Sequence, residues 1–132
     1  MSRVGSRDTG PEKRIRSLLY GLGFRFRLCD RSLPGTPDIV LKRHKTVIFV
    51  NGCFWHRHKG CSRATTPETR REFWEAKFAR NVERDERSRK ELRRLGWRVI
   101  VVWECRMKEI LAHPERLARA VAGPSRRRFI EL

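Results

Sequence analysis

Cysteine and histidine side chains are concentrated in one short stretch of this chain. Cys53, His58 and Cys61 lie within a few residues of one another, and Cys105 follows much further along. Thiolates and imidazoles are the ligands that zinc prefers, and a site that takes four of them is closed and structural. The stretch therefore predicts a structural zinc site with three cysteines and one histidine.

Other interpretations of the same stretch stay open at this point. His56 is a competing ligand, and a site with both histidines and two cysteines would leave Cys105 free. All the thiols could also be free and the histidines solvated. Cys29 lies upstream and has no evident partner, so we expect an ordinary buried thiol there. Disulfides are not expected, because the chain has the character of an intracellular protein.

The expected topology brings the distant cysteine back to the stretch. Residues 46–50 and 97–103 have the composition of strands, and residues 67–95 between them have the character of a long charged helix. A strand–helix–strand unit of this kind makes its two strands parallel. Cys53 lies three residues past the first strand and Cys105 two past the second. Both are therefore predicted at one edge of the sheet.

A carboxylate is predicted close to the same edge. Asp38 opens the strand 38–41, which forms an antiparallel hairpin with residues 46–50. An aspartate beside an irregular loop rich in carbonyls suits Mg²⁺, which can polarise a phosphodiester. Taken alone, Asp38 could equally just end a loop. Glu12 and His56 are secondary candidates, the first to orient water and the second to transfer a proton near neutral pH.

Aromatic side chains accompany the cations around this stretch. Phe54 and Trp55 lie on the predicted zinc loop, where they could stack on bases or enter between them. Trp74 has helical spacing with Phe78 and Val82, which by itself favours a place in the core.

The remaining elements complete an α/β fold with a mixed sheet. Residues 11–22 predict a helix that begins at Pro11 and carries Glu12 in its first turn. Residues 24–28 predict a short strand, and 107–122 a last helix. We expect a mobile arm at 1–10, one domain at 11–122, and a basic tail at 123–132.

The charge of the chain indicates its partner class. The 32 lysines and arginines outnumber the 15 aspartates and glutamates, which gives a net charge of +17. A charge of this sign on so small a domain points to nucleic acid. A membrane-surface role would need a basic helix with a clean apolar face, and the long helix instead carries both signs of charge. With no apolar run of spanning length and no signal-peptide core, we expect a soluble, cytoplasmic protein.

Five motifs together resemble the very short patch repair (Vsr) endonuclease family. They are Leu33-Pro-Gly-Thr-Pro-Asp-Ile-Val40, Val47-Ile-Phe-Val-Asn-Gly-Cys-Phe-Trp-His56, Glu72-Phe-Trp74, Asn81-Val-Glu-Arg-Asp85 and Leu95-Gly-Trp-Arg-Val-Ile-Val-Val-Trp-Glu-Cys105. The resemblance covers most of the chain, from about Glu12 to Cys105. It implies a restriction-endonuclease-like fold and a metal-dependent nick in one DNA strand, on the 5′ side of the T in a T:G mismatch produced by deamination of 5-methylcytosine.

The resemblance also implies roles for individual residues. Asp38 and the carbonyl of Val50 would bind Mg²⁺, His56 would be the catalytic histidine, and Glu12 would support the waters around the metal. The zinc ligands would be Cys53, His58, Cys61 and Cys105. The DNA-contacting residues would be Phe54, Trp55 and Trp74, which open the duplex, and Lys77 and Asn81, which face the mismatched bases.

The resemblance implies partners and a location as well. The substrate would be double-stranded DNA with a mismatch, and mismatch-repair proteins and a cognate cytosine methyltransferase system would act with the enzyme. The protein would be a monomer without membrane contact, at the nucleoid when it acts.

Three features depart from the family pattern. Asn51 stands where the best-known members carry a second active-site histidine, so it could position water or phosphate, and proton transfer would fall to His56 alone. Val50 replaces a threonine, and the loop from His56 to Cys61 is one residue longer. Two other functions remain as alternatives: a zinc-stabilised DNA-binding module without catalysis, and a nickase for another mismatch or flanking sequence.

Overall fold

The fold is a mixed sheet between two layers of helices. The computed structural model describes residues 10–123 and 128–132. Within these parts the helices are α1 (Gly10–Gly21), α2 (Arg71–Arg94), α3 (Met107–Ala112) and α4 (Pro114–Ala122). The strands are β1 (Arg27–Leu28), β2 (Ile39–Leu41), β3 (Thr46–Asn51), β4 (Arg98–Trp103) and β5 (Phe129–Glu131). The predicted α/β class with a mixed sheet flanked by helices is confirmed.

Strand pairing follows the strand order β1-β2-β3-β4-β5. The β2–β3 hairpin is antiparallel, with Ile39 opposite Ile48, and a short turn at Lys42–His44 connects its strands. The pair β3 and β4 is parallel, and Asn51 at the end of β3 lies opposite Trp103 at the end of β4. The predicted strand–helix–strand unit is thus present, and the carboxyl ends of its two strands coincide.

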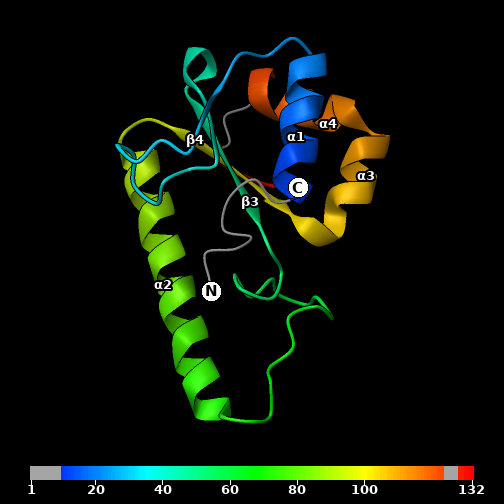
Figure 1. Ribbon diagram of the computed structural model, residues 1–132. Helices are drawn as coiled ribbons and strands as arrows, with labels where there is room; N and C mark the ends of the chain where they lie inside the picture. Colours follow the sequence, from blue (N-terminus) through cyan, green and yellow to red (C-terminus); the bar gives the residue numbers. More distant parts are fainter. Residues whose placement is uncertain (1–9, 124–127) are drawn as a thin grey trace.

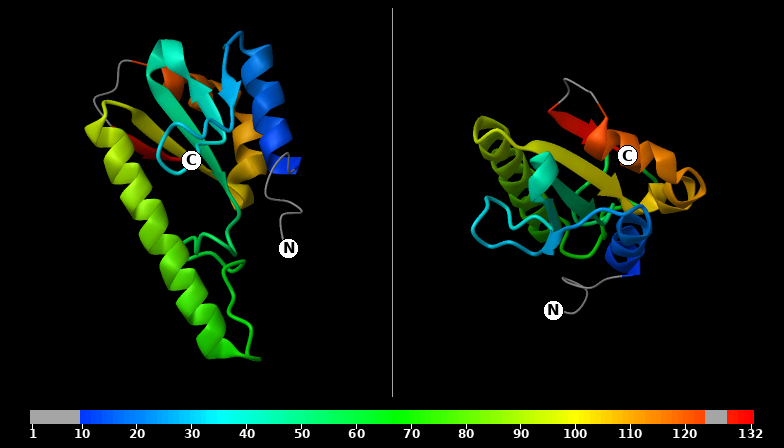
Figure 2. Two further views of the ribbon diagram at one scale, coloured as in Figure 1. Left: turned by 60° about the vertical axis from the view of Figure 1, so that its left-hand side comes forward. Right: turned by 90° about the horizontal axis from the view of Figure 1, so that it is seen from above.

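Each face of the sheet is covered by different helices (Figures 1 and 2). On one face α1, α3 and α4 pack on a cluster that includes Ile48, Ile100 and Val102. On the other face Leu92 of α2 packs on a cluster that includes Val99. Because successive side chains of β4 point to opposite faces, its apolar run serves both clusters.

The long helix α2 extends past the edge of the sheet (Figure 1). Its 24 residues span about 36 Å at a rise of about 1.5 Å per residue. Strand β4, with 6 residues, spans only about 20 Å. The first turns of α2 therefore lie beyond the sheet, and the segment between β3 and α2 returns alongside them. This overhang carries the candidate site.

The predicted last helix over 107–122 is wrong in one respect, because it is two helices. The break lies at His113, and Pro114 begins α4. Proline has no backbone N–H, and it disfavours the helical conformation of the residue before it. Proline is well suited to the first turn of a helix, so the chain ends α3 and begins α4 there.

The predicted basic tail at 123–132 contains a strand. Residues 124–127 lie outside the described residues, but Phe129–Glu131 form β5, which is parallel to β4. Phe129 packs against the cluster on the α2 side, and Ile130 and Leu132 pack against the cluster on the opposite side. Successive side chains of a strand point to opposite faces of the sheet, and the edge of β4 supplies the hydrogen-bond partners of β5.

Smaller differences concern the ends of elements. The strand predicted at 24–28 is limited to Arg27–Leu28, and the helix predicted at 67–95 begins at Arg71. The predicted arm at 1–10 lies outside the described residues except for Gly10, which begins α1. No helix in the described parts of the chain has the length and apolar character needed to cross a membrane.

Candidate active site and metal cluster

Cys53, His58, Cys61 and Cys105 converge on one point, and their ligand atoms all lie within 4.8 Å of one another. His58 Nδ1 is 3.6 Å from Cys53 Sγ and 3.3 Å from Cys105 Sγ. Ligands of a tetrahedral zinc ion lie about 3.3–3.8 Å apart when the metal–ligand bonds are about 2.0–2.3 Å. The cluster therefore fits a four-coordinate metal ion, and Cys29 is not part of it.

The surroundings of the cluster orient its ligands. The ring of His58 stacks on Trp103 with the ring centroids 4.2 Å apart and the planes 6° from parallel. The indole N–H of Trp103 donates a hydrogen bond to Glu131 in β5 at 2.9 Å. Strand β5 therefore holds Trp103, and Trp103 in turn holds the ring of His58. Burial raises the pKa of the Cys53 thiol to about 12. A metal ion would offset that cost, because it binds the thiolate form.

Asp38 lies at the start of β2 beside the end of β3. Its Oδ2 accepts a hydrogen bond from the backbone N–H of Val50 at 2.7 Å. The pKa of Asp38 is raised to about 7, chiefly by burial; the charge of Glu12 also raises it, while the Val50 N–H, His56 and Arg16 lower it. The carboxylate is thus held in a place where its negative charge is poorly solvated. A bound cation would stabilise it there.

Two further polar residues of the predicted site, Glu12 and Asn51, are buried. Glu12 in the first turn of α1 is only 5% exposed, and its carboxylate lies 3.8 Å from the guanidinium of Arg16. Asn51 at the end of β3 is 4% exposed. Alternation along β3 places Asn51 on the same face as Val47, which is the face that α2 covers. The charges of Glu12 and His56 both act on the Asp38 carboxyl group, so these three residues lie near one another.

His56 is paired with a residue to which the sequence analysis gave no role. Its Nδ1 lies 2.6 Å from Oδ2 of Asp85 on α2, and both side chains are partly buried, with 31% and 20% exposed. This contact fixes the ring and leaves Nε2 free to face a substrate. Since Nδ1 contacts Asp85 and His56 lies outside the metal cluster, the structure favours His58 over His56 as the metal ligand.

The sequence carried a signal for Asp85. Trp74, Phe78, Asn81 and Asp85 recur at spacings of four, three and four residues, so they share one face of α2. Phe78 on that face is buried and the other three are partly buried. A carboxylate that continues a buried helix face needs a partner, and the nearest histidine stretch offered one.

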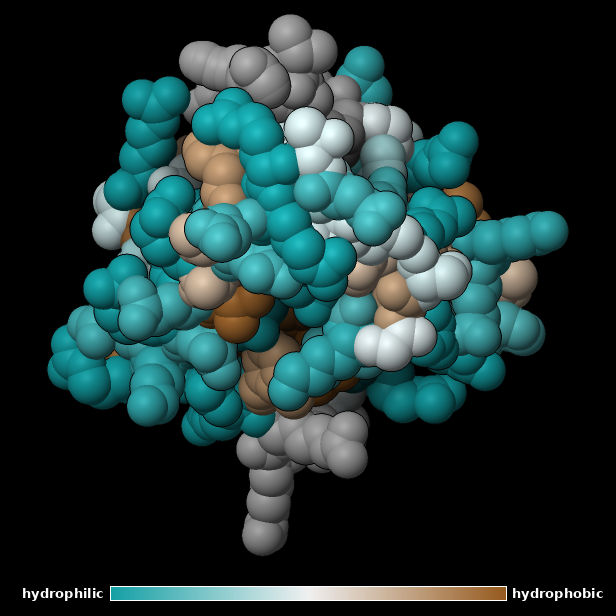
Figure 3. All heavy atoms as spheres, turned by 90° about the horizontal axis from the view of Figure 1, so that it is seen from below, coloured by the Kyte–Doolittle hydropathy of each residue, from teal (hydrophilic) through white to brown (hydrophobic). Residues whose placement is uncertain are grey.

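Aromatic rings from the loop and from α2 form one cluster. Phe54 lies edge-on to Trp55 at 5.0 Å and to Phe78 at 5.1 Å, and Trp55 lies 5.9 Å from Trp74. Trp55 is 42% exposed, and Phe73 beside Trp74 is 43% exposed. Trp74 is half-buried, so it is neither a core residue nor free in solvent. The view from below shows apolar side chains surrounded by hydrophilic ones on this face (Figure 3).

Lys77 and Asn81 lie beside this cluster. The ammonium of Lys77 is 5.6 Å from the centre of the Trp55 ring. The side chain of Asn81 donates a hydrogen bond to the carbonyl of Trp55 at 3.3 Å and accepts one from Arg84 at 2.8 Å. Both residues therefore contact the aromatic loop itself, which gives them a structural role in addition to the predicted contact with bases.

Comparison with known proteins identifies relatives of the whole chain. A family model described as DNA mismatch endonuclease Vsr matches residues 1–63. The type II nicking enzyme V.XorIIP of Xanthomonas oryzae pv. oryzae is 46% identical over 125 residues, which cover 95% of this chain and 90% of the relative. The DNA mismatch endonuclease Vsr of Escherichia coli is 51% identical over 108 residues, which cover 82% of this chain and 69% of the relative.

A solved structure shares the fold. The catalytic domain of the homing endonuclease I-Bth0305I superposes with a TM-score of 0.61 at 20% sequence identity, over 89% of this chain and all of that domain. At this identity the likeness concerns the fold alone, and it agrees with the arrangement of sheet and helices described above.

Proposed function

Because the chain belongs to the Vsr family of DNA mismatch endonucleases, we propose that it nicks one DNA strand on the 5′ side of the T in a T:G mismatch. The observation that carries the proposal is that His56, which pairs with Asp85 and whose charge acts on Asp38, shares its loop with Phe54 and the exposed Trp55. Such a site unites hydrolytic groups with a surface that can stack on bases.

Asp38 and the carbonyl of Val50 would hold Mg²⁺. Carboxylate and carbonyl oxygens are the ligands this ion takes, and the buried Asp38 gains from a neighbouring positive charge. The ion would polarise the scissile phosphate and stabilise the charge on the leaving oxygen. The Val50 N–H fixes one oxygen of Asp38 and leaves the other free. Glu12 places a second carboxylate in the same buried region, where it can orient water.

His56 would transfer the proton. With Nδ1 held by Asp85, Nε2 can take a proton from the attacking water or give one to the leaving oxygen. Asn51 is a hydrogen-bonding residue without a titratable ring, so it positions water or phosphate and leaves proton transfer to His56. The carboxylate of Asp85 stabilises the imidazolium that forms during this transfer.

Replacing Asp85 by asparagine should slow nicking by about tenfold to about a hundredfold, which is part of the about hundredfold to ten-thousandfold that general acid–base catalysis contributes. The amide keeps the shape of the side chain but removes the charge that stabilises protonated His56. The rate is measured with an end-labelled T:G duplex under single-turnover conditions, across the pH range. Glu83→Gln, on the exposed surface of the same helix, is the matched control. Equal rates for Asp85→Asn and wild type would contradict the role of the pair.

Phe54, Trp55 and Trp74 would open the duplex beside the mismatch. Insertion of aromatic side chains costs least where the base pair is already weak, which is how a mismatch would be selected. Lys77 and Asn81 lie next to these rings, so an inserted wedge would bring them close to the mismatched bases. The structural metal, which we propose to be zinc, would keep the loop that carries the wedge in one shape.

DNA binding should weaken steeply with salt. The chain carries a net charge of +17, and arginines and lysines continue along the exposed face of α2 beside the aromatic cluster. If about six phosphates are neutralised, the logarithm of the association constant falls with the logarithm of salt concentration with a slope of about −5. Fluorescence anisotropy with a labelled duplex in Ca²⁺, between about 50 and about 200 mM salt, measures the slope. A slope near zero would contradict a phosphate-dominated interface.

One experiment tests the proposed function directly. The protein is incubated with Mg²⁺ and with duplexes that carry each mismatch in varied contexts, and the nicks are mapped with end labels on either strand. A single nick 5′ of the T in T:G duplexes is the expected result. Nicks at another mismatch would correct the specificity, and binding without any nick would favour a DNA-binding module.

A further inference from the structure

Arg57 occupies an unusual backbone position in the loop between β3 and α2. It lies between the candidate catalytic residue His56 and the metal-cluster residue His58. The backbone N–H of His56 bonds to the carbonyl of Gly52, and that of His58 bonds to the carbonyl of Cys53, both at 3.1 Å. The turn is closed by Arg57 in the left-handed conformation, with a φ of 53°. Glycine is the residue that takes this position at least cost.

The contacts of the Arg57 side chain explain why arginine, and not glycine, occupies this left-handed position. Its Nη1 donates hydrogen bonds to the carbonyls of Phe54 at 3.0 Å and Thr65 at 2.9 Å. Its Nη2 donates to the carbonyl of Ala64 and to the hydroxyl of Thr66, both at 3.0 Å. One guanidinium thus joins the turn that carries Phe54 and Trp55 to residues 64–66, which lead toward α2. Lysine cannot do this, because it lacks the planar fork.

The same guanidinium also binds the loop to the helix. Its Cζ lies 3.8 Å from the centre of the Phe78 ring on α2 and 5.6 Å from that of Phe54. Stacking of this kind is favourable for arginine on an aromatic face. Arg57 is half-buried, and its donors are engaged within the protein. It is therefore placed to act on the loop and not on DNA directly.

We propose that Arg57 is the positioning residue that holds Phe54 and Trp55 in the geometry that opens the duplex. This inference rests on the proposed function, because it makes Arg57 the residue that keeps the duplex-opening rings, Phe54 and Trp55, rigid. Stacking of Phe54 and Trp55 on DNA can offset the free energy of unstacking a base only if the two rings are already in place. Ordering a loose loop on DNA would cost additional free energy. A residue in a disfavoured conformation whose side chain makes four hydrogen bonds fits such a role.

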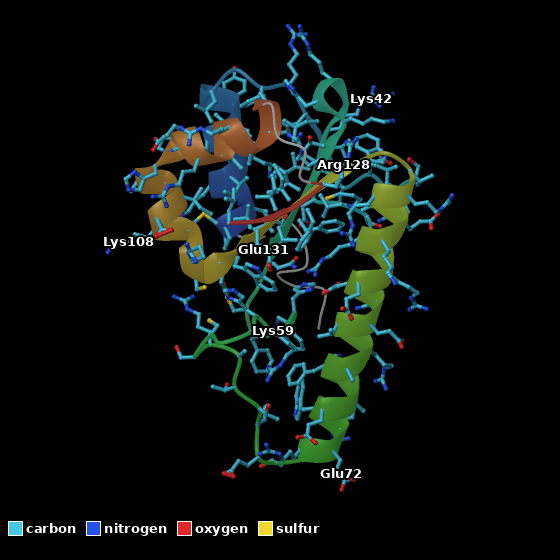
Figure 4. All side chains as sticks on the ribbon, turned by 180° about the vertical axis from the view of Figure 1, so that it is seen from behind. Lys42, Lys59, Glu72, Lys108, Arg128 and Glu131 are labelled. Atoms are coloured by element: carbon cyan, nitrogen blue, oxygen red, sulfur yellow. The ribbon has the colours of Figure 1, made fainter. Side chains whose placement is uncertain are left out.

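Three variants separate positioning from charge and from folding. Arg57→Lys keeps the cation and loses the fork, Arg57→Gly loses the fork but relieves the backbone, and Lys59→Ala is the control. Lys59 is an exposed cation on the same loop (Figure 4). Its removal tests the loss of one positive charge there. Zinc content per chain is measured for each protein, and Trp55→Ala serves as the reference for a missing wedge.

The test compares two substrates, a T:G duplex and a duplex in which the T:G pair is flanked by unpaired bases. The second is already open, so it does not need a rigid wedge. We expect Arg57→Lys and Arg57→Gly to lose about tenfold or more in kcat/KM on the T:G duplex and to recover to within about threefold of wild type on the open one. Lys59→Ala should change both rates by a similar small factor, and all variants should retain their zinc.

A second readout does not depend on cleavage. In Ca²⁺, 2-aminopurine placed next to the mismatch brightens when the wedge unstacks it, and this signal should fall in both Arg57 variants at saturating protein. Unchanged rates and unchanged fluorescence would overturn the inference, and so would equal losses on both substrates or a loss of zinc. A wild-type protein that brightens 2-aminopurine but never nicks would overturn the proposed function, while the fluorescence would still decide the role of Arg57.

Discussion

Replacing Asp38 by asparagine should abolish Mg²⁺-dependent nicking and at the same time stabilise the Mg²⁺-free protein. The loss of activity follows from the loss of the charged oxygen that would bind the ion, and we expect it to exceed about a thousandfold, since a metal supplies several kcal/mol to such a transition state. The amide oxygen of asparagine can still accept the hydrogen bond from the Val50 N–H. The fold around β2 and β3 should therefore be preserved.

The gain in stability has a defined pH dependence. Burial raises the pKa of Asp38 from 3.8 to about 7, so the folded state favours the protonated form. Asp38 therefore contributes no destabilisation below about pH 4, where it is protonated in both the folded and the unfolded state. As the pH rises to about 7, the free energy of unfolding falls, because the unfolded state loses this proton more easily than the folded state. Well above pH 7, Asp38→Asn should be more stable than wild type by about 4 kcal/mol, or roughly 15 °C in Tm.

Thermal unfolding in Mg²⁺-free buffer across this pH range measures the effect, without a chelator that would remove zinc. Asp30→Asn is the matched control, because Asp30 lies outside the site and hydrogen bonds from Ser32 lower its pKa. That variant should nick normally and gain no stability at neutral pH. Adding Mg²⁺ should stabilise wild type and not Asp38→Asn. Nicking by Asp38→Asn would contradict the proposed active site.

Parts of this molecule that depend on topology could be predicted from the sequence. The parallel pair β3 and β4 was predictable from two apolar runs separated by a long charged helix, and it placed Cys53 and Cys105 at one edge. Sequence spacing alone left His56 and His58 as rival ligands. The contact of His56 with Asp85 favours His58, because it gives the other histidine a different partner.

Features that depend on side-chain contacts between distant segments could not be predicted in the same way. Arg57 is one cation among many in the sequence, and its four hydrogen bonds arise only when residues 64–66 return beside it. Strand β5 is too short to form a pattern of its own next to a run of arginines. Its stability comes from an edge of β4 that the rest of the chain builds.

Removing the structural metal should loosen the loop between β3 and α2 and lower the stability of the protein. The four side chains come from two loops that the sheet brings together, so an ion bound there would crosslink residues 53–61 to Cys105. Metal affinity in such a site is part of the folding free energy. Without an ion, the buried Cys53 thiol remains, with its pKa raised by burial, and the stacking of His58 on Trp103 is left to hold this loop against β4. We expect a fall in Tm of at least about 10 °C, with the sheet still formed.

Cys105→Ser tests this prediction without a chelator, and Cys29→Ser is its matched control. Cys29 is a free thiol outside the cluster, so its replacement should leave zinc content and Tm unchanged. Thiol titration of the native protein should find Cys29 alone reactive, and all four cysteines should react after metal removal. Cobalt substitution should give the absorption of a tetrahedral thiolate site, because three of the four ligands are sulfur. An unchanged Tm after verified metal loss would mean that the loop keeps its shape through Arg57 and the aromatic cluster instead.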